Sequence, residues 1–299
     1  MRAACYPKGD LDPDQFVSQE THQNNQLPQS ILKSVIQEVW PKDAPVNAIG
    51  IASVGPLDLT TGSVITAPNI PEWLNFPIVD FLSDQFRVPV FLDNDANLAA
   101  LGEWKYGSGV GHHNLVYVTV STGIGGGVII EDRILHGERG LAAELGHITV
   151  LPDGPLCTCG QYGHLEAVAS GPAIAKSVKE AIQRGQRSIL SADQIITSKM
   201  VANAAAAGDE LALTVLNEAA EYLGRACADF LHIFNPSILI IGGGVAQSGE
   251  ILLDPLRQAV KRYTLSPEYM KNLTICPAAL GSETGLIGAL ALAENSQAE

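Results

Sequence analysis

Apolar residues recur along this chain in two patterns, one typical of amphipathic helices and the other of buried strands. Positions three and four apart predict helices at about 28–40, 96–104, 172–184, 209–234 and 285–294. Unbroken apolar runs predict strands at about 46–52, 88–92, 115–120, 128–130 and 238–241. The tight turn at Glu131 and Asp132 indicates a hairpin series in this part of the chain. Residues 5–30 are polar and predict a loop-rich start without a core element.

The mixture of hairpins and β–α units predicts an α/β fold with two lobes. We expect a smaller N-terminal lobe at 1–112, with a C-terminal helix at 285–299 packing back on it, and a larger lobe at 113–284. In the smaller lobe, a predicted strand runs into Asp93, Asn94 and Asp95, and a helix follows. Ligands of open α/β sheets bind where strands end and helices begin, so this junction is a candidate site.

The composition restricts the possible functions. The 299 residues are 46% hydrophobic and 17% charged, which is typical of a globular protein with a large core. A net charge of -14 disfavours nucleic acids and anionic membranes as partners, because both require a basic surface. No apolar run is long enough to span a membrane, and the N-terminus has no apolar signal-peptide core. Five cysteines do not suggest a disulfide framework, so we expect a cytoplasmic protein.

Two glycine-rich turns follow predicted strands. In Ser121–Gly127, four of the last five residues are glycine, so backbone amides could approach a phosphate closely. An ordinary flexible hairpin explains the same residues equally well, and no Lys-Ser/Thr pair follows to make a Walker loop. The second turn, Gly242–Gly244, could support a flat ligand or be a tight strand-to-helix turn.

The Asp93-Asn94-Asp95 motif offers a carboxylate at a strand end, which can accept a proton from a hydroxyl as a general base. The neighbouring Asn could hold the same hydroxyl by hydrogen bonds. Asp and Asn are also the favoured residues for helix N-caps, and the motif alone favours that interpretation.

A cluster of potential metal ligands follows the first glycine turn, at His147, Cys157, Cys159 and His164. Two thiolates and two imidazoles complete a tetrahedral zinc site with no open position, which is a structural rather than a catalytic arrangement. The alternative is two reduced cysteines near scattered histidines. Glu144 and Glu166 flank the cluster and suit sugar hydroxyls, although isolated acidic residues are more often solvated surface.

Together these segments resemble the ROK family (repressors, open reading frames and kinases) over nearly the whole chain. The resemblance rests on Glu144–His147, Cys157–Glu166, Asn94–Asn97 with Gly102 and Glu103, Ser121–Gly127 and Gly242–Val245, in the family's order and spacing. It implies the actin-like, ribonuclease H-like two-lobed ATPase fold. It also implies a sugar kinase that transfers the γ-phosphoryl group of ATP to a hexose 6-hydroxyl with Mg²⁺, glucose being the leading acceptor.

The resemblance implies roles for individual residues, with Asp95 as the catalytic base. The hexose-binding residues would be Asn69, Asn94, Asp95, Glu144, His147 and Glu166. The nucleotide-binding residues would be Thr122, Gly123 and Gly125 at the phosphates and Gly243 and Gly244 at the adenosine. The ligands of a structural Zn²⁺ would be His147, Cys157, Cys159 and His164.

Two features depart from the family pattern. His164 stands where the family has a third cysteine, and since imidazole also binds zinc, we expect the site to persist. The family's opening strand and Asp-x-Gly-Gly-Thr phosphate loop, with the Asp that positions Mg²⁺, have no counterpart in the sequence. The missing strand should leave an unpaired edge in the N-terminal sheet. Weak ATP binding and slow turnover are therefore expected.

Several alternatives stay open. The acceptor could be fructose, mannose or an N-acetylhexosamine instead of glucose, and polyphosphate could replace ATP as donor. A catalytically impaired sugar-binding or regulatory protein is the competing hypothesis. Family repressors carry an N-terminal helix-turn-helix, for which the chain has no room, and the acidic balance opposes DNA binding. The resemblance implies a homodimer or homotetramer.

Overall fold

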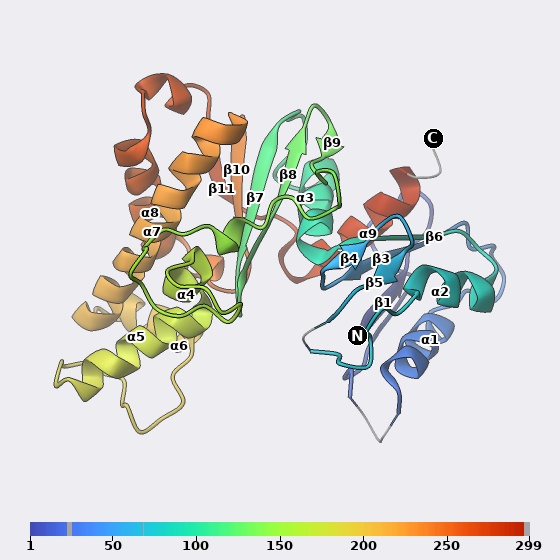
Figure 1. The fold of residues 1–299 in the computed structure, drawn as a ribbon, viewed down its shortest axis with the longest axis horizontal. Coiled ribbons are helices and arrows are strands. Elements are labelled where there is room, and N and C mark those ends of the chain that lie inside the picture. The colour runs from blue at the N-terminus through green and yellow to red at the C-terminus, as the bar shows by residue number, and fades with distance from the viewer. Residues whose placement is uncertain (23–25, 68, 296–299) are drawn as a thin grey trace. The chain divides into compact units, whose positions relative to one another are not determined.

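The computed structural model describes residues 1–22, 26–67 and 69–295 (Figure 1). Contacts divide the chain into two compact units. The first contains Met1–Tyr106, His136–Ala142 and the C-terminal residues from Ser282, and the second contains Gly107–Leu135 and Ala143–Gly281. The sequence analysis placed the boundaries after residues 112 and 284, and it did not anticipate that a segment from the middle of the chain packs with the first unit.

The second unit contains a five-stranded sheet in the order β9-β8-β7-β10-β11. Its strands are β7 (Leu115–Val120), β8 (Ile124–Ile130), β9 (Arg133–Ile134), β10 (Ile238–Gly242) and β11 (Thr274–Pro277). Strands β7, β10 and β11 are parallel, and β8 is antiparallel to both β7 and β9. The helices of this unit are α4 (Leu165–Ala169), α5 (Gly171–Gln183), α6 (Ser198–Ala206), α7 (Glu210–Phe234) and α8 (Glu250–Tyr263).

The core of the second unit forms where long apolar patterns meet. Every residue of β10 is buried, as expected for a central strand covered on both faces. Helix α7 is capped by Asp209, whose carboxylate accepts from the Ala212 amide at 2.8 Å, and it buries Leu216, Leu223 and Phe230 along one face. The sequence predicted α7 from a long apolar periodicity and β10 from an unbroken apolar run.

The described residues of the first unit form three separate pairs of strands. They are β1 (Arg2–Cys5) with β2 (Gln15–Ser18), β3 (Ile49–Ser53) with β6 (Val90–Asn94), and β4 (Leu57–Asp58) with β5 (Ser63–Val64). The β3–β6 pair is parallel and the other two are antiparallel. The helices are α1 (Pro28–Glu38), α2 (Ile78–Phe86), α3 (Asp95–Tyr106) and α9 (Thr284–Asn295). One buried apolar cluster, with Ala3, Ile31, Ile51, Leu82 and Val90 among its members, joins the pairs.

The β1–β2 hairpin corrects the prediction that residues 5–30 hold no regular element. Strand β2 is exposed at three of its four residues, so it has no apolar alternation to reveal it, and its pairing with β1 defines it instead. Among the described residues, β1 pairs only with β2 and β3 only with β6, so neither pair extends into a larger sheet. In the second unit, β7 lies between the antiparallel hairpin of β8 and β9 on one side and the parallel pair of β10 and β11 on the other.

None of the helices in the described parts of the chain is both long enough and apolar enough to cross a membrane.

Helix α9 packs against α3 and β3 at positions where only glycine fits. A Cβ added to Gly288 would lie 1.9 Å from the carbonyl oxygen of Leu98, and one added to Gly50 would lie 1.9 Å from that of Ala289. Both distances are far below contact between a carbon and an oxygen. The C-terminal helix is therefore held in the first unit by close backbone approach as well as by apolar burial.

We predict that Gly288→Ala lowers the free energy of unfolding by about 1–3 kcal/mol, as overpacking of a tight contact does. Gly285→Ala, in the same helix, is the matched control, because its nearest neighbour would be 3.9 Å away. The control should be neutral or stabilising by up to about 1 kcal/mol, since alanine is the better helix former. Chemical denaturation of both variants measures the difference, and equal stabilities would contradict this account of the packing.

Candidate functional site

The junction between β6 and α3 holds two of the predicted site residues of the first unit. Asn94 ends the strand and Asp95 begins the helix. The Asn94 side chain accepts a hydrogen bond from the Ala96 amide at 2.9 Å, so the capping role that the sequence suggested for this motif is filled by Asn94. Asp95 is exposed in the first turn of the helix.

Asp93 lies just before this junction and is 2% exposed. One of its carboxylate oxygens accepts from the Asn94 amide at 2.7 Å and from the Asn97 side chain at 3.0 Å. The other oxygen lies 2.6 Å from Nε2 of His136. Sequence reasoning missed His136, because it lies 43 positions along the chain in a segment with no motif. Its pKa is raised by the hydrogen bond to Asp93, against the lowering effect of burial.

Asn69 is exposed on the segment between β5 and α2. Its carbonyl oxygen lies 2.8 Å from Nε2 of His22. The structure therefore places this predicted sugar-loop residue in the first unit, together with Asn94 and Asp95.

In the second unit, the first glycine turn is shorter than the sequence predicted: only Ser121–Gly123 connect β7 to β8, because Ile124–Gly127 pair with β7 as part of β8. The Ser121 amide donates to the Gly123 carbonyl at 2.8 Å, and the Ile124 amide donates to a carboxylate oxygen of Glu166 at 2.9 Å. A Cβ at Gly123 would lie 2.4 Å from the same carboxylate oxygen, so a larger residue there would displace the Glu166 side chain. Thr122 is exposed at the tip of the turn, and Gly125 lies partly exposed in β8.

The second glycine turn follows β10 and packs against the end of β7. Gly243 has a φ of 86°, and a Cβ there would lie 2.3 Å from the Val120 carbonyl oxygen. The Val245 amide donates to that carbonyl at 3.0 Å. Gly244 is different, because it is exposed and a Cβ would meet nothing within 4 Å. Backbone packing therefore explains why position 243 is a glycine. Gly244 instead leaves open space beside the ends of the parallel strands β7 and β10, where a ligand could lie.

The four predicted metal ligands converge in the second unit. The ligand atoms of His147, Cys157, Cys159 and His164 all lie within 4.8 Å of one another. Sγ of Cys157 is 3.8 Å from Nδ1 of His147, and Sγ of Cys159 is 3.2 Å from Nδ1 of His164. Ligand atoms around a tetrahedral Zn²⁺ would be about 3.3–3.8 Å apart, given zinc–nitrogen and zinc–sulfur bond lengths. The donor set and spacing therefore fit such an ion.

The loop between Thr149 and His164 brings the four side chains of this cluster together. Isolated bridges pair Thr149 with His164 and Leu156 with Tyr162, which brings the cysteines back toward the histidines. Burial raises the pKa of the Cys157 thiol, and a bound cation would offset this by stabilising the thiolate.

Glu166, in the first turn of α4, connects the metal-ligand loop with the first glycine turn. One oxygen accepts from the Thr158 hydroxyl at 3.0 Å and from the Cys157 thiol at 3.7 Å, while the other accepts from the Ile124 amide. Glu144 is exposed, and its carbonyl accepts from the His147 amide at 3.0 Å. Sequence reasoning missed Thr158, although its position between two metal ligands was a signal.

Comparisons with known proteins agree over most of the chain. A model of the ROK family matches residues 10–296. The glucokinase of Thermotoga maritima is 39% identical over 266 residues, which are 88% of this chain and 83% of that enzyme. A ROK family glucokinase from Streptomyces griseus, solved in complex with glucose and AMPPNP, has a TM-score of 0.80 and 35% identity and covers 94% of this chain and 91% of its own. The xylose repressor of Caldicellulosiruptor bescii is 32% identical, over 80% of this chain and 61% of the repressor.

Proposed function

Because the chain belongs to the ROK family, we propose that it is an ATP-dependent kinase that phosphorylates the 6-hydroxyl of glucose. The observation that carries the proposal is the match, over 94% of the chain, to a glucokinase solved with glucose and AMPPNP. The family and the actin-like α/β fold are those that the sequence analysis predicted, and the comparisons confirm both.

The regulatory alternative has weaker support. The repressor is less similar than the glucokinase, at 32% against 39% identity. The chain also spans a smaller share of the repressor, 61% against 83% of the glucokinase. A kinase is therefore the better proposal, and direct measurement of turnover decides between the two.

In the first unit, Asp95 is the proposed general base. Attack on the γ-phosphorus requires the sugar hydroxyl to be held in place and to lose its proton as the new bond forms. The carboxylate of Asp93 is buried and engaged by three donors, whereas that of Asp95 is exposed at the start of a helix. The side-chain amides of Asn94 and Asn69 would hold hydroxyls of the hexose.

In the second unit, Glu144, His147 and Glu166 are the proposed partners of the remaining sugar hydroxyls. Nδ1 of His147 faces Cys157 in the metal-ligand cluster, which leaves Nε2 for a hydroxyl. This division suits histidine, because a metal-bound imidazole uses its second nitrogen for a hydrogen bond. Glu166 would accept a hydrogen bond from a sugar hydroxyl in addition to those it accepts from Thr158 in the metal-ligand loop and from Ile124 after the first glycine turn.

The two glycine turns of the second unit are the proposed nucleotide-binding elements. Thr122, Gly123 and Gly125 would face the phosphates, and Gly243 and Gly244 would face the adenosine. The support is that both turns lie at the ends of adjacent parallel strands, where backbone amides can donate to a ligand. Mg²⁺, bound with ATP, would neutralise charge that builds up on the phosphates during transfer.

We assign a structural Zn²⁺ to His147, Cys157, Cys159 and His164. All four positions of a tetrahedral ion would be filled by protein, so the ion would hold the loop rather than react. Through this loop it would also orient His147 and Glu166, the two proposed sugar ligands closest to it in sequence. A cytoplasmic location and a homodimer or homotetramer complete the proposal, and the free thiols of all five cysteines are compatible with a reducing compartment.

Asp95→Asn should lower kcat by about 10²–10⁴-fold, because it removes the proton acceptor and keeps the shape of the side chain. The dissociation constant for glucose should change little, since proton acceptance belongs to the transition state. Coupled assays with glucose and Mg-ATP, together with calorimetric titration of glucose, measure both quantities. Asp84→Asn on the surface of α2 is the control. An unaltered chain that binds glucose without turnover would favour the regulatory alternative.

Gly244→Ala should raise KM for ATP several-fold and leave KM for glucose unchanged, because a methyl group would occupy space open to the nucleotide. Its melting temperature should match that of the unaltered chain, since no protein atom lies within 4 Å of the added carbon. Gly285→Ala serves again as the control. An unchanged KM for ATP would remove the second glycine turn from the nucleotide site.

The purified protein should contain one zinc per chain, and a strong chelator should lower its melting temperature, because metal-binding energy contributes to folding. Cys159→Ser should reduce the metal content, whereas Cys5→Ser, which lies in β1 outside the cluster, should not. Elemental analysis and thermal melts provide the measurements. Stoichiometry near zero in protein prepared without chelator would refute the zinc assignment.

A further inference from the structure

His136 is the first residue of the segment 136–142, which leaves the second unit after β9 and packs with the first. The segment closes on itself, because the Ala142 amide donates to the His136 carbonyl at 3.1 Å. It also packs on the first unit at Gly140, where an added Cβ would lie 3.2 Å from a methyl group of Leu59. The backbone of His136 is therefore fixed in position within the first unit.

The side chain of His136 reaches from this segment to the buried carboxylate of Asp93. Nε2 lies 2.6 Å from one oxygen, which is a short, charge-assisted geometry. The other oxygen of Asp93 is occupied by the Asn94 amide and the Asn97 side chain. Asp93 thus joins three parts of the first unit: the end of β6, the first turns of α3 and the segment 136–142.

We propose that His136 is a positioning residue for phosphoryl transfer: by holding the Asp93 carboxylate, it fixes the strand end that presents Asn94 and Asp95. This inference rests on the proposed function, in which Asp95 is the base and Asn94 a sugar ligand. Without the His136 contact, one oxygen of a buried carboxylate would lack its partner, and the carboxylate would turn to find another donor. The Asn94 amide, which that carboxylate also holds, would shift with it.

The charge on His136 gives this contact a pH dependence of known sign. Asp93 is the charged group in contact with the ring, and its neighbours Asn94 and Asn97 carry no charge. The pKa of His136 is raised by the hydrogen bond to Asp93. The pair's contribution to stability is therefore complete below the unfolded pKa of about 6.5 and is lost as the pH rises through the higher folded pKa.

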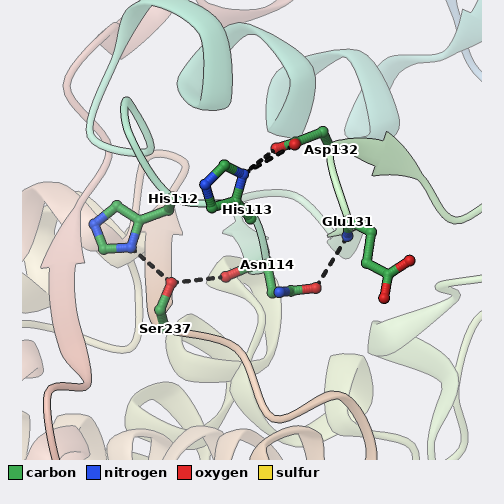
Figure 2. Close-up of polar contacts among 6 residues, drawn as sticks. All are labelled: His112, His113, Asn114, Glu131, Asp132 and Ser237. Carbon is green, nitrogen blue, oxygen red and sulfur yellow. Dashed lines mark hydrogen bonds and ion pairs between the residues drawn. The ribbon is translucent and has the colours of Figure 1, made fainter.

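A second His–Asp pair supplies a matched control in the second unit. Figure 2 shows His113 against the carboxylate of Asp132, with Nδ1 at 2.8 and 2.9 Å from its two oxygens. This pair is well exposed, with 75% of the His113 and 50% of the Asp132 side chain accessible, against 39% and 3% for His136 and Asp93. Exposed ion pairs contribute little, so loss of the His113 contact should have small effects.

The experiment compares His136→Ala, His136→Gln and His113→Gln in the full chain. His136→Ala should lower kcat by about 10- to 100-fold, because small displacements of catalytic groups have effects of that size. It should weaken glucose binding several-fold through Asn94 and change KM for ATP by less than about twofold. Glutamine can place an N–H donor near the position of Nε2, so His136→Gln should recover most of kcat. His113→Gln should behave as the unaltered chain.

Hydrogen exchange tests the positioning without turnover. The amides of Asn94 and Ala96, which depend on Asp93 and Asn94 for their acceptors, should exchange faster in His136→Ala than in His113→Gln. The difference in melting temperature between the unaltered chain and His136→Gln should be largest below about pH 6.5 and should shrink at higher pH.

The outcomes separate this inference from the proposed function. Unchanged exchange at residues 93–97 in His136→Ala, or faster exchange with unchanged kcat and glucose affinity, would overturn the positioning role. If the unaltered chain shows no turnover, the proposed function fails, and exchange together with glucose affinity still decides whether His136 positions Asn94.

Discussion

The carboxylate of Glu166 makes the contacts on which the candidate site of the second unit depends. One oxygen accepts from the Ile124 amide, directly after the first glycine turn, and the other accepts from Thr158 in the metal-ligand loop. A tight turn cannot pair all of its own amides, and an ionised acceptor gives a stronger bond than a neutral one. Two motifs that are separate in the sequence are therefore one structural element, and a change in the loop reaches the turn through a single side chain.

The first unit uses a carboxylate in the same way, with a further consequence for chemistry. Asp93 and Asp95 are two residues apart, yet one is buried with three hydrogen-bond donors and the other is exposed at a helix start. The different surroundings of these two carboxylates fit the division of roles proposed above, in which Asp93 holds the end of β6 and Asp95 is the general base.

The sequence predicted those features whose cause is local. Helix α7 follows from a long apolar periodicity and strand β10 from an unbroken apolar run. The convergence of Cys157 and Cys159 with two histidines follows from their spacing. The hairpin of β1 and β2 could not be predicted, because β2 buries almost nothing and is defined by its partner.

The contact between His136 and Asp93 was beyond sequence reasoning for a related cause. It joins two residues that are far apart in the sequence and that only the folded chain brings together. Nothing in the sequence near His136 marks its segment as part of the first unit. The same holds for the separate strand pairs of that unit, whose connection through one apolar cluster is a property of the tertiary structure. The sequence therefore pointed to candidate site residues within motifs, and it did not reveal the residues that contact them in the folded chain.

The strong negative charge of the chain limits how it can bind ATP. With a net charge of -14, the molecule as a whole repels a nucleotide, but at physiological ionic strength such repulsion is screened beyond about 8 Å. Affinity must then come from groups in direct contact. The proposed nucleotide-binding turns contain no lysine or arginine, so their donors are backbone amides and the hydroxyls of Ser121 and Thr122. Backbone donors bind well only if the backbone that carries them is held in place. The hydrogen bonds from the Ile124 amide to Glu166 and from the Val245 amide to the Val120 carbonyl hold the two turns in this way.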